Sequence, residues 1–303
     1  GVDAAGEVLQ AFWRAHGLIV SVIPRERFGD VIAADLPCPD AADQRPVVLL
    51  GHRDTVFPDG EATRRPFTMR DGRGHGPGVA DMKSGLVIEA FVMAAFAACG
   101  APGMPLRMVT TSDEEIASPA CAEVITDEAR KARAVFNAEP SRTRSTPPGD
   151  NLRTQVITRG RKGGVFLKAE MTGKAAHSGA HYDRGRSAIL DLGQKIAPLH
   201  ALTDLQRGVS VNVGLIGGGQ TVNTIAPSAW AEIDLRYVEP EQRDEMVSAI
   251  RRIVETPAVD GVTSRLSISG EFLPLVQTAE ARYLLDLYTR AAAELGIEVS
   301  AEF

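Results

Sequence analysis

Four apolar runs in the first half of this sequence each lead into side chains that can bind a metal ion. The polar residues at the ends of these runs are His52 and Asp54, Asp81, Glu114 and Glu115, and Glu139. Imidazole nitrogens and carboxylate oxygens are both ligands of zinc. A strand that ends in His-x-Asp delivers its side chains to one rim of a sheet, and the ligands of open α/β sheets bind at that rim. The pattern therefore predicts a metal site.

The adjacent residues Glu114 and Glu115 indicate how such a site could catalyse hydrolysis. Two metal ions that share a bridging carboxylate can together activate one water molecule, and a base must then take the proton of that water. Neighbouring side chains point different ways, so one glutamate can bind metal while the other faces the substrate. A single acid here is more often a solvated loop carboxylate, and a single histidine is as often a satisfied polar residue. The five together favour the site.

The first half of the chain alternates strands with helices. We expect helices at 4–16, 84–99 and 118–131, and strands at 18–23, 29–33, 47–52, 106–111 and 133–138. Ser118 and Pro119 are a typical helix start, the apolar helix 84–99 is expected to be buried, and 59–78 is expected to be a long loop because it lacks periodicity. The alternation predicts an α/β domain with a mostly parallel sheet that is covered on both faces.

The second half follows another pattern after a polar, proline-rich stretch at 141–150, which is expected to be a linker. We then expect strands at 163–172, 209–216, 229–238 and 262–269, with helices at 186–199 and 241–255. This order of strands and helices is typical of the ferredoxin-like α+β sandwich. A helix between Thr278 and Gly296 and a strand at 297–303 end the chain. The predicted domain boundaries are 1–160, 161–271, and 272–303, where the chain returns to the first domain.

Composition argues against several other functions. The net charge of −6 disfavours a nucleic-acid partner, and the three cysteines lack the spacing of a disulfide framework or a zinc knuckle. We see no apolar run of membrane-spanning length and no GxSxG of a serine hydrolase. The glycines at 74–78 lack the lysine of a P-loop and the spacing of a dinucleotide-binding turn. Composition does not decide the compartment: a cytoplasmic location is slightly favoured, and a periplasmic one stays open if a signal peptide has been removed.

Four stretches resemble, in order, the motifs of a zinc metallopeptidase family. They are His52-Arg53-Asp54-Thr55-Val56, 76–85, 111–115 and 137–140. The family includes glutamate carboxypeptidase, acetylornithine deacetylase, succinyl-diaminopimelate desuccinylase and the aminoacylases. The second domain is similar to that family's inserted lid or dimerisation domain, with comparable motifs at 176–179, 221–227 and 234–237. The resemblance covers nearly the whole chain and is closest to glutamate carboxypeptidase.

The resemblance implies a role for each residue of the first-domain set. Asp81 would bridge two zinc ions, for which Co²⁺ or Mn²⁺ could substitute. His52 and Glu139 would complete the first metal site, and Glu115 would serve the second. Glu114 would be the general base. Asp54 would accept the ring N–H of His52 and fix its tautomer, and the Asp81–Met82 peptide bond is expected to be cis, as is usual in the family.

Three residues of the second domain have implied roles with plain alternatives. The resemblance implies that His177 stabilises the oxyanion in the active site of a partner subunit, although a turn histidine is an equally simple interpretation. Asn223 and Arg236 would hold the carboxylate or carbonyl of the substrate, while Arg236 alone could be a strand-surface arginine. These roles imply a homodimer through the lid domain.

The function implied is a dizinc hydrolase that cleaves an amide bond next to a free carboxylate, with a small peptide or an N-acyl amino acid as substrate. An N-acyl-amino-acid deacylase and a metal-free binding protein with the same fold are the alternatives. Two features depart from the family. Gly270 and Glu271 stand where glutamate-specific members carry an arginine, and no histidine follows His200 to act as the last metal ligand. We expect that ligand beyond Phe303.

Overall fold

The computed structural model describes residues 1–100, 103–140 and 154–302. The chain divides into two compact units, Gly1–Pro140 and Ser141–Phe303. The linker expected at 141–150 lies outside the described residues. The predicted domain boundaries at 160 and 271 stay predictions.

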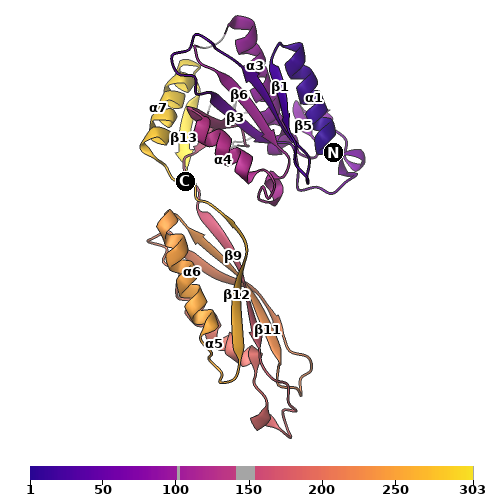
Figure 1. Ribbon diagram of the computed structural model, residues 1–303, viewed down its shortest axis with the longest axis vertical. Helices are drawn as coiled ribbons and strands as arrows, with labels where there is room; N and C mark the ends of the chain where they lie inside the picture. Colours follow the sequence, from indigo (N-terminus) through magenta and orange to yellow (C-terminus); the bar gives the residue numbers. More distant parts are fainter. Residues whose placement is uncertain (101–102, 141–153, 303) are drawn as a thin grey trace. The chain divides into compact units, whose positions relative to one another are not determined.

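A five-stranded sheet organises the first unit (Figure 1). Its order is β1 (Ile19–Ile23), β2 (Val31–Leu36), β6 (Leu106–Thr111), β3 (Val47–His52) and β7 (Ala134–Asn137). Only β6, β3 and β7 are parallel, because β2 pairs antiparallel with both β1 and β6. The α/β class is confirmed, but the sheet is mixed rather than mostly parallel.

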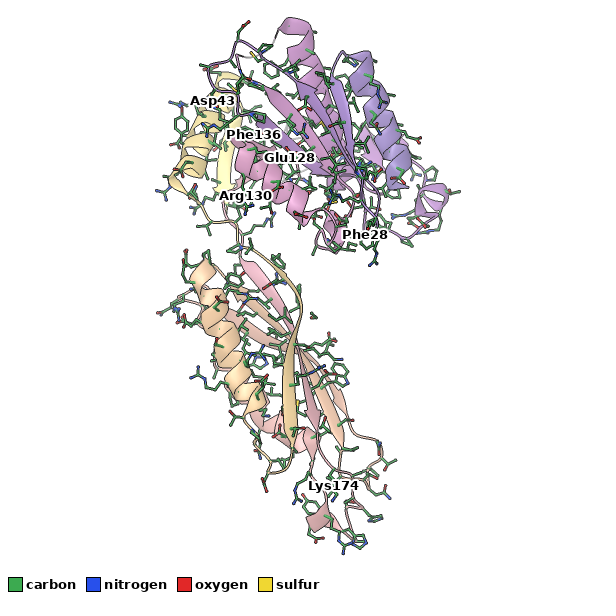
Figure 2. The ribbon with its side chains drawn as sticks, viewed as in Figure 1. Phe28, Asp43, Glu128, Arg130, Phe136 and Lys174 are labelled. Carbon is green, nitrogen blue, oxygen red and sulfur yellow. The ribbon has the colours of Figure 1, made fainter. Side chains whose placement is uncertain are left out.

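Helices cover both faces of this sheet, as expected, and strand β2 shows why. Its side chains alternate in direction: Ile32 packs with α1 (Val2–Ala15) and α3 (Ser84–Cys99), whereas Val31 packs with α4 (Ala122–Lys131). Arg107 on β6 links α4 to β2 through polar contacts. Its guanidinium donates hydrogen bonds to Glu128 of α4 at 2.8 Å and to Asp35 of β2 at 2.7 Å (Glu128 is labelled in Figure 2).

Helix α3 has the predicted bounds but not the predicted burial. Leu86 and Met93 lie in the core, while Val87, Ile88 and Phe91 on its other side are 54–60% exposed. The segment Val79–Cys99 has the length and composition of a membrane span. However, Asp81 and Met82 have non-helical dihedral angles, so the continuous helix has 16 residues and is about 24 Å long, shorter than a bilayer core of about 30 Å. Its packing on the sheet is that of a core helix.

Two further expectations in the first unit are wrong. The segment expected to be a loop at 59–78 contains α2 (Glu61–Arg64) and a hairpin of β4 (Thr68–Arg70) and β5 (Arg73–His75). Asp71 and Gly72 at its turn both have positive φ, as the tight hairpin turn requires. Helix α4 begins at Ala122 rather than at Ser118.

The second unit contains the ferredoxin-like arrangement that the sequence predicts. Its four-stranded sheet has the order β10 (Ser210–Gly218), β11 (Ser228–Tyr237), β9 (Gly163–Thr172) and β12 (Thr263–Phe272). Every neighbouring pair is antiparallel. Helices α5 (Ala188–His200) and α6 (Pro240–Glu255) bury one sheet face in a single apolar core.

The end of the second unit adds a helix and a strand pair. Helix α7 (Ala279–Glu294) begins after Thr278, whose hydroxyl accepts the N–H of Ala281 as an N-cap, and Gly296 follows with a φ of +71°. Strand β13 (Glu298–Glu302) pairs in parallel with β8 (Thr154–Thr158). Sequence patterning predicts the helix, its cap and β13, but not β8.

Candidate metal centre

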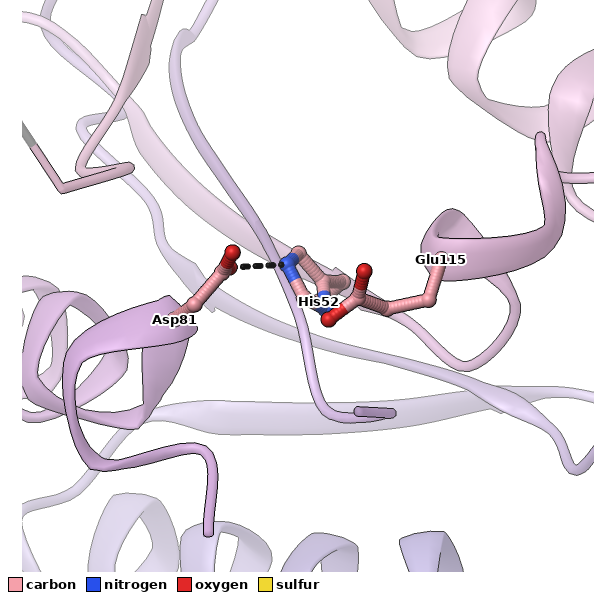
Figure 3. Close-up of side chains that lie close together, drawn as sticks. All are labelled: His52, Asp81 and Glu115. Atoms are coloured by element: carbon pink, nitrogen blue, oxygen red, sulfur yellow. Dashed lines mark hydrogen bonds and ion pairs between the residues drawn. The ribbon is translucent and has the colours of Figure 1, made fainter. Parts of the chain in front are cut away.

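The first unit brings the five predicted metal-site residues together around one histidine. His52, the last residue of β3, has a side chain that is only 1% exposed. Its Nε2 atom lies 3.1 Å from Asp81 Oδ1, 3.2 Å from Glu139 Oε1 and 3.8 Å from Glu114 Oε2. Figure 3 shows Asp81 and Glu115 approaching the His52 ring from separate segments.

The donor atoms form two overlapping groups, each small enough to surround a cation. One is His52, Asp81 and Glu115, and the other is His52, Glu114 and Glu139; within each group the ligand atoms lie within 4.8 Å of one another. Imidazole and carboxylate donors are the set that zinc accepts. The residues present therefore fit a metal ion.

The strand order explains this convergence. Strands β6, β3 and β7 are parallel neighbours, so their carboxyl ends meet at one edge of the sheet. Glu114 and Glu115 lie in the turn η2 (Glu114–Ile116) just after β6, and Glu139 follows β7. Asp81 lies in η1 (Val79–Lys83), which leads into α3.

Asp54 ties two of the predicted ligands together. Its Oδ1 lies 3.2 Å from His52 Nδ1, and its Oδ2 accepts the backbone N–H of Glu115 at 2.9 Å. His52 Nδ1 and Asp54 Oδ1 have no well-aligned hydrogen-bond partner in the part of the chain that the structure describes, so their contact is an ion pair when the imidazole is protonated. Burial raises the pKa of Asp54, but the contacts with His52 and Glu115 outweigh burial and lower it.

The cluster is strongly negative. Burial lowers the pKa of His52, but the contacts with Asp54 and Glu139 outweigh it and raise the value to about 11. Burial and the neighbouring carboxylates raise the pKa of both Glu114 and Glu115. A bound divalent cation would relieve this repulsion between carboxylates and favour the neutral imidazole, because metal ligands lose protons on binding.

Met82 packs the Asp81 segment against β3. The Asp81–Met82 peptide bond is cis, as the family resemblance implies. The Met82 side chain is fully buried, and its sulfur accepts the backbone N–H of His52 at 3.2 Å. Gly51 leaves room for it, because a Cβ there would lie 2.8 Å from Met82 Cε.

Two cations beside the cluster are functional candidates that sequence reasoning missed. Lys83 Nζ donates to the carbonyl of Arg53 at 3.1 Å, and burial lowers the pKa of Lys83. Arg53 is buried, and its guanidinium donates to the carbonyls of Thr111, Val2 and Asp30. Both brace the chain that follows His52. Arg53 lies in the motif at 52–56 and Lys83 in the motif at 76–85. That position within the family-like motifs is the sequence feature that could have identified them.

Glu89 on α3 is a third missed residue. It is 4% exposed in an otherwise apolar helix. Burial raises its pKa to about 8, the bond from the Ala138 N–H opposes the rise, and Glu139 adds to it. The sequence feature that could have identified Glu89 is that it is the one carboxylate in the most apolar predicted helix.

We expect Glu89 to make stability depend on pH. The ordinary pKa of a glutamate side chain is 4.5, whereas the pKa of Glu89 in the folded protein is about 8. Between these values the folded state keeps a proton that the unfolded state has lost, so the free energy of unfolding falls as pH rises through the window and levels off above about 8. The test is denaturant unfolding of the chelator-treated wild type and of Glu89→Gln. The free energy of unfolding of both proteins is measured at pH values within this window and on both sides of it. Their stability difference should change with pH; a constant difference would contradict the assignment.

His177 and Asn223 lie together in the second unit. Nδ1 of His177 accepts the backbone N–H groups of Gly179 and Ala180 at 3.1 and 3.2 Å. That nitrogen therefore acts as an acceptor, and the ring proton of the neutral imidazole is at Nε2. The backbone carbonyl of Asn223 accepts the N–H of Ser178 at 2.9 Å, which joins the two loops.

Arg236 occupies a separate place on the open face of the same sheet. Its Nε lies 2.9 Å from Asp234 Oδ1, and its guanidinium lies over the rings of Phe166 and Phe272 at 5.3 and 5.0 Å. Arg236 pairs with Gly164 at the start of β9, whereas His177 follows the end of β9 at Thr172. Within one chain the structure does not bring Arg236 to His177, because the length of a strand, about 26 Å for eight residues, separates those ends.

Comparisons with known proteins bear on both units. Residues 159–262 match the family model described as the peptidase dimerisation domain. Carboxypeptidase G2 of Pseudomonas sp. (strain RS-16) is 25% identical over 253 residues, which cover 82% of this chain and 58% of that protein. Acetylornithine deacetylase of Myxococcus xanthus is 30% identical over 224 residues, covering 68% of this chain and 54% of that protein. The chain thus spans little more than half the length of these relatives.

Solved structures share the fold. The M20 family metallo-carboxypeptidase Sso-CP2 of Sulfolobus solfataricus superposes with a TM-score of 0.74 at 16% identity and covers 99% of this chain and 80% of that one. The aminopeptidase PepT of Bacillus cereus gives a TM-score of 0.73 at 18% identity and covers 98% and 77%. The expected resemblance is thereby confirmed: this chain carries a peptidase dimerisation domain, its sequence is similar to those of carboxypeptidase G2 and acetylornithine deacetylase, and it shares the fold of the solved M20 metallo-carboxypeptidase.

Proposed function

We propose that this chain is a metal-dependent hydrolase that cleaves an amide bond next to a free carboxylate, as glutamate carboxypeptidase does. The observation that carries the proposal is the cluster of one buried histidine and four acids at the carboxyl edge of the sheet: His52, Asp81, Glu114, Glu115 and Glu139. The sequence relation to carboxypeptidase G2 supports it.

In this proposal the cluster would hold two zinc ions. His52 and Glu139 would serve one ion, Glu115 would serve the other, and Asp81 would serve both. When bound, such ions polarise the amide carbonyl and make water nucleophilic at neutral pH. Asp54 orients the His52 ring through Nδ1, so that Nε2 faces the carboxylates of Asp81 and Glu139.

Glu114 moves the proton. Burial and the nearby carboxylates raise its pKa, which makes its carboxylate a better acceptor for a proton of the attacking water. The same carboxyl can then donate that proton to the leaving amine. Its Oε2 is the farthest of the three carboxylate oxygens measured from His52 Nε2, at 3.8 Å, and is thus the least engaged with the histidine.

The second unit supplies groups that bind and stabilise the substrate. His177 presents a protonated Nε2 that can donate to an oxyanion, with Asn223 beside it, and Arg236 presents a guanidinium that suits a carboxylate. Because Arg236 lies at the opposite end of the sheet from His177, one substrate could use all three only if two protomers contribute. We therefore propose a homodimer.

Strand β10 is the surface we propose for the dimer. It is an edge of the four-stranded sheet, and its Leu215 and Ile216 are 57% and 59% exposed. Helix α5 packs on β10 and exposes Ile189 and Leu190. An exposed apolar edge strand invites pairing, and a twofold contact through β10 and α5 would cover strand and helix together.

Subunit mixing tests the shared site. Homodimers of His177→Ala and of Glu114→Gln should each be nearly inactive. A mixed dimer would contain one site with wild-type groups at both positions, so activity should reappear after the two variants are mixed and exchange subunits. Absence of recovery after exchange has been confirmed by mass spectrometry would mean that His177 acts locally or only structurally.

A second candidate function is an N-acyl-amino-acid deacylase, favoured by the 30% identity to acetylornithine deacetylase. Metal analysis coupled to a panel of peptides with carboxyl-terminal glutamate and of N-acyl amino acids separates the candidates. We expect turnover of the glutamate peptides. Preference for the acyl amino acids would favour the deacylase, and bound metal without turnover of any substrate would favour a binding protein.

A further inference from the structure

The first two turns of α3 contact the backbone of the segment that carries Glu139. We propose that Gly85 and Glu89 form a clamp on Ala138 that fixes the separation between the carboxylates of Asp81 and Glu139. The inference rests on the proposed metal centre and adds two positioning residues to it.

Glu89 forms the polar half of the clamp. Its Oε1 accepts the backbone N–H of Ala138 at 3.2 Å, and its Oε2 is buried without a hydrogen-bond partner among the described residues. The helix around it is apolar, with Leu86, Ala90 and Met93 in the core. A carboxyl group that is buried at a cost and makes a single backbone bond is poorly explained by packing.

Gly85 forms the steric half. A Cβ at this position would lie 2.2 Å from the carbonyl oxygen of Ala138. Gly85 and Glu89 are four residues apart and so lie on one face of the helix, one turn from each other. The glycine lets the helix reach the Ala138 carbonyl while the glutamate accepts the N–H of the same residue.

The clamp joins two ligand-bearing segments. Helix α3 begins at Ser84, three residues after Asp81. Glu139 follows Ala138 directly, and its own N–H donates to Asn137 Oδ1 at 2.7 Å. The Asp81 segment and the Glu139 segment are therefore held to one rigid helical element, although 58 positions separate them in sequence (139 minus 81).

The consequence is expected in metal affinity. Groups that orient metal ligands from behind typically change affinity by about 10- to 100-fold when they are removed. Loss of the clamp would let Glu139 shift relative to Asp81 while the sheet stays intact. Removing a buried carboxyl should not destabilise the metal-free fold, so stability and affinity should respond differently.

The experiment compares Glu89→Met, Glu89→Gln and Gly85→Ala with wild type in Co²⁺ binding, measured by chelator competition and by the visible absorption spectrum. Glu89→Met keeps the length of the side chain but loses the acceptor, and should weaken binding about 10- to 100-fold with a changed spectrum. Glu89→Gln keeps an oxygen for Ala138 and should bind like wild type. Gly85→Ala should weaken binding, and Gly193→Ala on α5, where a Cβ meets nothing within 4 Å, is its matched control.

Thermal unfolding of the chelator-treated variants separates positioning from folding. Glu89→Met should be at least as stable as wild type and still bind weakly. Wild-type affinity and spectrum in folded Glu89→Met would overturn the clamp. A wild-type chain that binds no divalent cation would overturn the proposed metal centre, and the clamp with it.

Discussion

Replacing Glu114 with glutamine is expected to lower kcat by about 10²- to 10⁴-fold, the usual loss on removal of a general base. The amide keeps the size and polarity of the side chain but cannot take a proton from water. The metal content should stay near that of wild type, because His52, Asp81, Glu115 and Glu139 are unchanged. Steady-state kinetics and metal analysis of the same preparation measure both quantities.

Glu115→Gln is the matched control for this variant. Glu115 groups with His52 and Asp81, whereas Glu114 groups with His52 and Glu139. We expect Glu115→Gln to lose metal together with activity. If Glu114→Gln loses metal and Glu115→Gln keeps it, the roles of the two neighbours are exchanged.

Removal of metal should abolish hydrolysis. Asp81, Glu114 and Glu139 all approach one imidazole nitrogen within 3.8 Å, and the proposed nucleophile is a water molecule that needs a bound metal ion to act at neutral pH. Dialysis against a strong chelator should therefore reduce turnover to background, and added Zn²⁺ or Co²⁺ should restore it.

Circular dichroism before and after dialysis controls for unfolding, so that lost activity can be assigned to lost metal. Added Mg²⁺ is a second control, because it prefers octahedral oxygen ligands and binds poorly through imidazole. Full activity in a protein shown to be free of metal would refute the proposed mechanism.

The cluster is predictable from the sequence because it depends on short local patterns and on the order of the strands. His52 and Glu139 each follow a short apolar run, and parallel strands place such ends on one edge. The direction of the outer strands was not predictable in the same way. An apolar run such as 29–33 looks the same in either direction, and only its pairing makes β2 antiparallel to β6.

Side-chain contacts that helix and strand patterns do not encode explain the boundary and the residue that sequence reasoning missed. Ser118 resembles a helix cap, but the Asp113 carboxylate accepts the N–H groups of Ala120 and Cys121, so the chain turns before α4 begins. Ser118 itself has a φ of +54°. Glu89 acts on a backbone 49 positions away, a distance that no local pattern encodes.

Arg53 couples the first turn of α1 to the loop that follows β3. Its guanidinium cannot give up its proton, and it lies 2% exposed with carbonyls from Val2, Asp30 and Thr111 as its partners. Fraying of the first turn of α1 would remove one of these partners and leave a buried charge less compensated. Loss of the Val2 contact would therefore act on the loop that carries His52 and Asp54. A substitution that breaks the first turn of α1 should thus disturb the predicted metal ligands without contacting any of them.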